Sequence, residues 1–192
     1  MTNQPIRLLG IAGSLRKGSY NRALLRAAKE LASSGMKIDL FEGLGDIPLY
    51  NEDVEKAGAP EPVQRLKRAI ADADGLLIAA PEYNYSVPGV LKNAIDWASR
   101  PPKDTPLHDK PAGIIGASTG MGGTIRAQLA LRQSFVFART PAFLQPEVLV
   151  TTAQNKFDAE GKLTDETTRK VLADFLDKLQ AWMRRQLASM KA

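Results

Sequence analysis

The segment GSLRKGSYN, residues 13–21, is the part of the chain whose residue types and spacing most directly suggest chemistry. It follows a short run of branched apolar residues and precedes a helical pattern, which predicts a strand, a tight turn and a helix N-terminus. In this geometry backbone N–H groups and the helix dipole converge on an anion, and Ser14, Arg16, Ser19 and Asn21 add donors. The segment is therefore predicted to bind a phosphate; the alternative is a flexible turn with a capping serine.

The common phosphate-binding loops do not match this segment. Gly13 and Gly18 have the separation of a Walker loop, but Ser19 follows Gly18 directly and Lys17 comes one place too early. No GxGxxG pattern follows the strand either. The predicted phosphate is therefore neither that of magnesium-bound ATP nor that of a dinucleotide in a Rossmann turn.

Two later loops carry groups that suit a planar ring. In PEYNYSVP, residues 81–88, two tyrosines stand beside Glu82 and Asn84, and such a set can hydrogen-bond and pack against a flat heterocycle. In ASTGMGG, residues 117–123, small side chains let a ligand approach the backbone. Each could also be an ordinary turn. Together the three loops describe a ligand with a phosphate at one end and a planar polar ring at the other, which is flavin mononucleotide (FMN).

These loops must be held by the elements around them. Five apolar runs are expected to be strands: residues 6–12, 37–41, 75–80, 112–117 and 145–150. Helical patterns occupy residues 21–34, 62–73, 89–99, 124–138 and the segment from Thr164 to Leu187, while 43–60 and 100–111 are expected to be irregular. This alternation predicts an α/β fold with a parallel sheet covered on both faces, which binds ligands at the carboxyl ends of its strands.

The helix boundaries follow from capping signals. The first helix is expected to end at Gly35 as its C-cap, and the last is expected to begin at Thr164 as its N-cap, with acidic residues behind it. The helix at 124–138 is apolar nearly all round. The last helix carries a continuous apolar stripe that is expected to face the core: Val171, Leu172, Phe175, Leu176, Leu179, Trp182, Met183 and Leu187.

Composition narrows the possible functions. The chain has 192 residues, which suits a single domain over 1–192, and it has no cysteine, which excludes disulfides, thiolate metal sites and cysteine nucleophiles. Its one histidine, His108, lies among prolines and is more simply a solvated loop residue than part of a catalytic triad. The net charge of +5 is spread along the chain without a basic tail, which suits small anionic ligands better than nucleic acid. No apolar run approaches the length of a membrane span, so membrane insertion is not expected either. A cytoplasmic protein is the simplest expectation.

Four segments resemble one known family: GSLRKGSYN at 13–21, PLYNEDV at 48–54, PEYNYSVPGVLKNAIDW at 81–97 and QNK at 154–156. They are similar to segments of the NADPH-dependent FMN reductases, and within these to the bacterial quinone and chromate reductases, some described as azoreductases. The resemblance implies a flavodoxin-like three-layer α/β sandwich whose five-stranded parallel sheet has the order 2-1-3-4-5, with helices on both faces.

The resemblance also implies which residues bind the cofactor. Those expected at the FMN phosphate are Ser14, Arg16, Lys17, Ser19, Tyr20 and Asn21. Those expected at the isoalloxazine ring are Pro81, Glu82, Tyr83, Asn84, Tyr85, Ser118 and Gly120. No catalytic side chain and no metal is expected, because the chemistry takes place on the flavin. Arg100 is a candidate for attracting an anionic substrate, or else a cation that satisfies a helix C-terminus.

As an activity, the resemblance implies hydride transfer from NADPH or NADH to FMN and then to small-molecule acceptors: quinones, chromate, azo compounds or free flavin. It implies a homo-oligomer, a dimer or a homotetramer, in which a neighbouring subunit helps to cover the flavin. Leu129 departs from the pattern, which has a tyrosine or polar residue there. The alternatives are a flavodoxin-like electron carrier without its own NAD(P)H oxidase activity and a flavin-free module that binds another phosphorylated ligand.

Overall fold

Five parallel strands form the central sheet of the computed structural model, which describes residues 4–190. The strands are β1 (Ile6–Ala12), β2 (Met36–Leu40), β3 (Gly75–Ala79), β4 (Ala112–Ala117) and β5 (Val148–Val150). Their order in the sheet is β2-β1-β3-β4-β5, and every neighbouring pair is parallel. The predicted flavodoxin-like sheet order is therefore confirmed.

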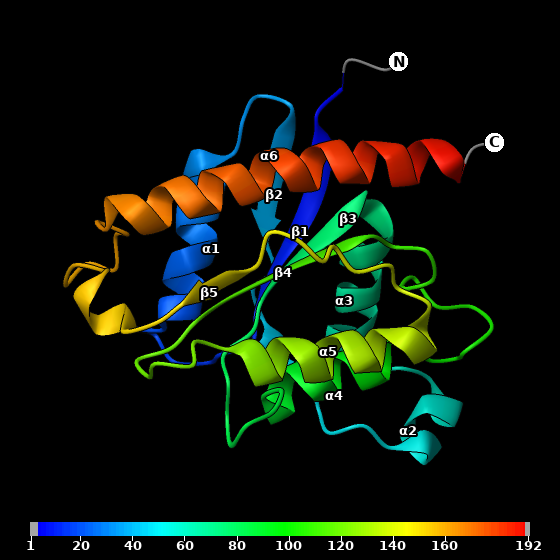
Figure 1. Cartoon of the computed structure of the whole chain (residues 1–192). Coiled ribbons are helices and arrows are strands. Elements are labelled where there is room, and N and C mark those ends of the chain that lie inside the picture. The colour runs from blue at the N-terminus through cyan, green and yellow to red at the C-terminus, as the bar shows by residue number, and fades with distance from the viewer. Residues whose placement is uncertain (1–3, 191–192) are drawn as a thin grey trace.

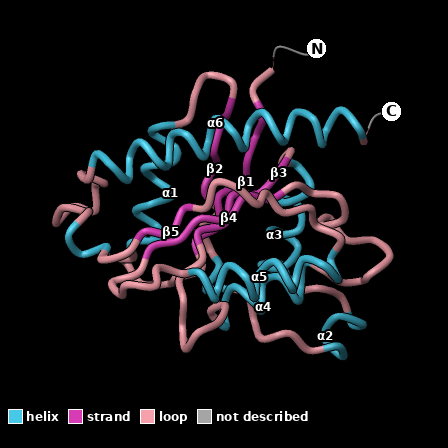
Figure 2. The backbone as a smooth tube through the Cα atoms, viewed as in Figure 1, coloured by secondary structure: helices cyan, strands magenta, loops and turns pink. Residues whose placement is uncertain are grey.

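Helices cover both faces of this sheet (Figures 1 and 2). The α-helices are α1 (Tyr20–Leu31), α2 (Glu52–Ala57), α3 (Glu61–Asp72), α4 (Gly89–Ala98), α5 (Ile125–Ala138) and α6 (Glu166–Ser189). Helices α1 and α6 lie on one face, and α3, α4 and α5 lie on the other. Successive strand residues point to opposite faces, so Leu8 packs with the first layer and Leu9 with the second. Burial on both faces explains why the strands read as unbroken apolar runs.

The first helix ends earlier than predicted. Helix α1 ends at Leu31 with Ala32 as its C-cap, so the expectation that Gly35 caps it is wrong. Gly35 instead directly precedes β2, and its carbonyl accepts a hydrogen bond from the backbone N–H of Ile6, the first residue of β1, at 3.0 Å. A side chain at this position would collide with Gln180 of α6. A larger residue at position 35 would therefore require the end of the Gln180 side chain to move, and the glycine has no role at a helix terminus.

The last helix begins one residue later than predicted. Its N-cap is Asp165 and not Thr164, because the Asp165 carboxylate accepts hydrogen bonds from the Thr168 backbone N–H at 2.8 Å and hydroxyl at 2.6 Å. Most of the predicted stripe is buried, but Val171 lies at its margin and is exposed. Trp182 and Leu187 are half-buried.

The segment 43–60 is more ordered than predicted. It holds a short 3-10 helix, η1 (Leu44–Asp46), and α2, which Figure 1 shows at the periphery of the molecule. Helix α4 fixes this segment, because Asn93 Nδ2 and Trp97 Nε1 each donate to the Pro48 carbonyl at 2.8 Å. A second 3-10 helix, η2 (Ala153–Asn155), follows β5. No helix among residues 4–190 is long and apolar enough to cross a membrane.

Candidate functional site

The loops that follow β1, β3 and β4 surround one hollow of about 130 Å³, which we call the loop hollow. It lies at the carboxyl edge of the sheet, where an α/β fold of this order presents its ligand site. The residues that line it are Ser14, Arg16, Ser19, Tyr20, Asn21, Pro81, Glu82, Tyr83, Ala117, Ser118 and Thr119. The structure thus brings residues of all three predicted loops together.

One end of the loop hollow offers donors to an anion. Ser19 is the N-cap of α1, and its Oγ accepts from the backbone N–H of Arg22 at 3.4 Å. The backbone N–H groups of Tyr20 and Asn21 pair with no acceptor among residues 4–190. With the nearby Ser14 hydroxyl and Arg16 guanidinium, they form the donor set that a phosphate monoester needs.

Asn21 also fastens two loops together. Its Nδ2 donates to the Ala117 carbonyl at 2.8 Å, and its Oδ1 accepts from the Ala117 backbone N–H at 3.0 Å. The side chain is buried. One amide hydrogen is left for a ligand, so the main function of this side chain is to hold the end of β4 against the start of α1.

The second loop contributes a tight turn beside the loop hollow. Tyr83 and Ser86 exchange two backbone hydrogen bonds, at 3.1 and 3.0 Å, around Asn84 and Tyr85. These two central residues have left-handed φ values of 50° and 67°, which cost energy for residues other than glycine. The Tyr83 hydroxyl lies 3.3 Å from Ser14 Oγ and so links this turn to the first loop.

The loop after β4 is held by its neighbour strand. The Ser118 backbone N–H donates to the Val150 carbonyl at 2.9 Å, and Ser118 Oγ accepts from the Gly120 N–H at 3.1 Å. Ala117 and Thr119 line the loop hollow but were not singled out from the sequence; their position beside Ser118 is the only signal that could have found them. Four predicted residues are not among the lining residues: Lys17, Asn84, Tyr85 and Gly120.

Arg100 lies away from the loop hollow. It follows the far end of α4, a helix of 10 residues that starts next to the ring-side loop, so about 15 Å of helix separates the two. Its guanidinium lies over the rings of Tyr50 and Phe137, with 5.9 and 5.5 Å to the ring centroids. Its Nε is buried and pairs with no group among residues 4–190.

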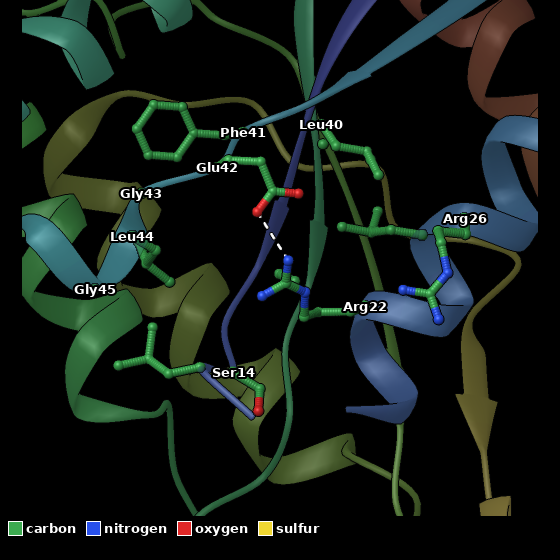
Figure 3. A pocket seen from close by; sticks show the side chains of 13 residues that line it. Ser14, Arg22, Arg26, Leu40, Phe41, Glu42, Gly43, Leu44 and Gly45 are labelled. Carbon is green, nitrogen blue, oxygen red and sulfur yellow. Dashed lines mark hydrogen bonds and ion pairs between the residues drawn. The ribbon is translucent and has the colours of Figure 1, made fainter. Parts of the chain in front are cut away.

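A second hollow of about 120 Å³ lies between α1 and the end of β2, and we call it the arginine hollow (Figure 3). Arg22 and Glu42 form an ion pair across it at 2.8 Å. Of the residues that line the loop hollow it shares only Ser14, and it contains neither the tyrosine turn nor the loop after β4. It therefore lacks the residues that the sequence predicts at a planar ring.

The chemistry of the residues that line the loop hollow fits FMN. Unpaired N–H groups and hydroxyls of the first loop suit its phosphate, and the tyrosine turn of the second loop suits its planar ring. A parallel 2-1-3-4-5 sheet with such a site at its carboxyl edge defines a flavodoxin-like protein. Residues 6–155 match the family described as NADPH-dependent FMN reductase, and the chain belongs to this family.

Individual relatives agree with this assignment. The chain is 53% identical over 180 residues to an NAD(P)H-dependent FMN reductase of Pseudomonas aeruginosa, covering 94% of this chain and 96% of the relative. It is 44% identical over 179 residues to a 2-hydroxy-1,4-benzoquinone reductase of a Burkholderia species, covering 93% and 97%. Among solved structures, the flavoenzyme NAD(P)H:(acceptor) oxidoreductase of Paracoccus denitrificans superposes with a TM-score of 0.86 at 38% identity, covering 94% and 98%.

The chain is accordingly an NAD(P)H-dependent oxidoreductase that uses FMN. An electron carrier without NAD(P)H oxidase activity is not favoured, because the matching family and these relatives are named as reductases.

Proposed function

We propose that this enzyme passes two electrons from NADPH or NADH through FMN to quinones, and that chromate, azo compounds and free flavin can replace the quinone. The observation that carries this proposal is the loop hollow, where anion donors and a planar-ring turn meet at one sheet edge. The names of the relatives support a quinone as the acceptor, since one acts on 2-hydroxy-1,4-benzoquinone and another, from Pseudomonas putida, is a quinone reductase at 44% identity.

In this proposal the first loop holds the phosphate. The N–H groups of Tyr20 and Asn21 point from the first turn of α1, where the helix dipole favours an anion, and Ser14, Ser19 and Arg16 add side-chain donors. Lys17 lies in the same loop and adds positive charge. These groups fix one end of the cofactor.

The second and third loops hold the ring. The backbone groups of Asn84, Tyr85 and Thr119 bond to no other backbone group among residues 4–190 and would supply hydrogen bonds, while Tyr83 supplies an aromatic wall. Ser118 and Gly120 shape the third loop, because their backbone groups bond within the protein. Bound FMN itself supplies the redox chemistry, because its ring accepts a hydride from the nicotinamide and passes the electrons on. No side chain is needed as a general base, so the task of the chain is to position the ring and leave one face open.

We further propose a homo-oligomer, a dimer or a homotetramer, assembled through α5. This helix exposes a stripe of apolar side chains in which Leu129 is 56%, Val136 78% and Phe137 62% exposed. A patch of this kind favours burial against a second copy. Since Arg100 lies one helix length from its own loop hollow, it could attract an anionic substrate only to the flavin of a neighbouring subunit.

We also propose that the chain works as one FMN-binding domain, because the sheet and both helix layers build the single site described above. A cytoplasmic location is the simplest one, since NADPH and NADH are supplied there.

The deciding experiment is an anaerobic titration of the FMN-loaded protein with NADPH, and separately with NADH, followed at the flavin absorbance band. Complete bleaching by one nucleotide, restored by benzoquinone without a radical signal, is the expected result and gives the nucleotide preference. A flavin that stays yellow with both nucleotides, or that stops at a one-electron state, would contradict the proposal.

A further inference from the structure

Glu82 is the one acidic side chain that lines the loop hollow among residues 4–190, and both of its carboxylate oxygens accept hydrogen bonds. Oε2 accepts from the backbone N–H of Arg126 at 2.9 Å and of Ala127 at 3.2 Å, and Oε1 lies 3.2 Å from Nη1 of Arg126. The side chain is 11% exposed. Its contacts thus lead away from the hollow and into the first turn of α5.

The N-cap residue of α5 does not cap the helix through its side chain. Its N-cap residue, Thr124, makes no side-chain capping bond, and its hydroxyl instead accepts from Gln128 Nε2 at 3.1 Å. A helix begins with N–H groups that lack intrahelical partners, and a carboxylate is the best acceptor for them. Glu82 therefore caps α5 from a different element, 44 residues earlier in the chain.

Arg126 also contacts Tyr85 in the tight turn of residues 83–86, which we call the ring-side turn. The guanidinium of Arg126 stacks on the Tyr85 ring at 3.9 Å from its centroid. Between Glu82 and Tyr85 the backbone enters the left-handed region at Asn84 and Tyr85, a conformation that persists only where the surroundings enforce it. The turn is therefore held at Glu82, which precedes the strained pair, and at Tyr85, the second member of that pair.

We propose that Glu82 is a positioning residue: its carboxylate, locked by Arg126 and the N-terminus of α5, holds the ring-side turn in shape and does not itself bind the flavin ring. This inference rests on the proposed flavin site in the loop hollow. The same contacts also compensate the negative charge of the Glu82 carboxylate. Reduction places negative charge on the ring, and a carboxylate without its cationic partners would oppose that charge at close range.

Two variants separate the positioning effect from the charge effect. Glu82→Ala removes both the cap of α5 and the ion pair with Arg126. In the apoprotein, the amides of residues 83–86 and 126–127 are therefore expected to exchange hydrogen about tenfold faster or more. The FMN dissociation constant is expected to rise about tenfold, the equivalent of one lost charge-assisted contact. Glu82→Asp, with a shorter reach to the same donors, is expected to recover part of both losses.

Charge balance is read from the midpoint potential of bound FMN. Arg126→Met leaves the carboxylate with less compensation, so the potential is expected to fall, whereas Glu82→Gln is expected to raise it. Opposite shifts of this kind are not produced by loosened packing alone. Glu42→Gln is the matched control, because Glu42 also pairs with an arginine, at 2.8 Å, but in the arginine hollow. This control is expected to leave exchange in the turn, affinity and potential unchanged.

Wild-type exchange rates and FMN affinity in Glu82→Ala would overturn the proposal, as would equal potentials in Arg126→Met and the wild type. Should Glu82→Ala fail to fold by circular dichroism, Glu82→Gln and Arg126→Met carry the same test. If the wild type itself binds no FMN, the proposed flavin site is wrong. The exchange measurement on the apoprotein still decides whether Glu82 holds the turn.

Discussion

Asn21 shows how one buried amide fixes two loops of the site. It bonds both backbone groups of Ala117, at 2.8 and 3.0 Å, and so joins the start of α1 to the end of β4. These two backbone groups belong to Ala117, the last residue of β4. The phosphate end of the loop hollow therefore depends on a side chain that mainly contacts protein.

Replacing Asn21 by alanine tests this dependence. The change leaves a buried N–H and a buried carbonyl without partners, which is expected to lower the free energy of unfolding by about 2 to 4 kcal/mol. FMN affinity is expected to fall as well, because the loop loses its anchor. Urea denaturation of the apoprotein and a flavin fluorescence titration measure the two effects.

Asn51→Ala is the control for this prediction. Asn51 is an exposed cap of the short helix α2, and its Oδ1 accepts from the Asp53 N–H at 2.8 Å. Its loss is expected to cost about 1 kcal/mol or less. Equal losses in the two variants would show that the Asn21 contacts have no special weight.

Residue types in the loops predicted the location of the site but not what each side chain contacts. Local patterns place Ser14, Ser19 and Tyr83 at strand ends, and the structure gathers them around one hollow. These local patterns do not predict contacts between distant residues, such as Asn21 with Ala117, 96 positions apart, or Glu82 with Arg126. Such partners depend on how far the sheet twists and how helices sit on it, which spacing along the chain does not encode.

At the scale of elements, Gly116 sets how closely β4, the end of β3 and α5 approach one another. A Cβ at this position would lie 2.7 Å from the Ala80 carbonyl oxygen and would also overlap the side chain of Thr124. The carbonyl belongs to the buried residue that directly follows β3 and bonds to β4 through its own N–H, so it cannot easily move aside. The third loop therefore leaves the sheet at a point where only glycine fits.

Gly116→Ala is accordingly expected to destabilise the fold by about 1 to 3 kcal/mol through overpacking. Gly89→Ala is the matched control, because a Cβ there meets no atom within 4 Å at the start of α4. It is expected to be neutral or to stabilise the chain by up to about 1 kcal/mol. Chemical denaturation of both variants measures the difference, and similar midpoints would contradict the packing argument.

The N-cap of α6 makes stability depend on acid. The hydroxyl of Thr168, and then its backbone N–H, hold the pKa of Asp165 below its usual value. A carboxylate with a lowered folded pKa stabilises above its unfolded pKa, about 3.9, and this contribution disappears as pH falls through the lower folded value. Asp165→Ala is therefore expected to be less stable than wild type at pH 7, with the gap closing below about pH 4.

Thr168→Val separates this cap from a general helix effect. It removes the hydroxyl and keeps the shape of the side chain, so the pKa of Asp165 is expected to rise toward its usual value in a carboxyl NMR titration. An unchanged titration would show that the hydroxyl bond has no role in the acid dependence.

Long periodic elements were predictable from the chain, and short ones were not. Helix α6 and the buried strands β1, β3 and β4 follow the expected ranges within a few residues, because burial imposes a clear pattern on them. Strand β5 has 3 residues, and α2 has 6 residues with none buried. Contacts from other elements hold such pieces, so the residues inside them carry little periodic signal.

At the scale of the whole molecule, the exposed stripe on α5 predicts assembly. Val136→Asp combined with Leu129→Asp places charges on this stripe at positions that pack little against their own chain, being 78% and 56% exposed. Light scattering is expected to show a fall from the oligomer to the mass of one chain, with the fold retained by circular dichroism. Charges in an apolar interface oppose association strongly.

Val171→Asp serves as the control, since this residue is an exposed valine on α6, on the opposite face of the sheet. It is expected to leave the mass unchanged. If the α5 variant remains an oligomer, the interface does not lie on α5.

The walls of the loop hollow come from three segments that are far apart in sequence, at residues 14–21, 81–83 and 117–119. No single one of these segments contains the whole site, so FMN is expected to bind the folded chain and to have almost no affinity for the unfolded one. A ligand of this kind shifts the folding equilibrium by mass action, by about 2.7 kcal/mol at a hundredfold excess over its dissociation constant. Thermal midpoints should therefore rise with added FMN, and flavin supply would control how much folded enzyme survives as well as how much is active.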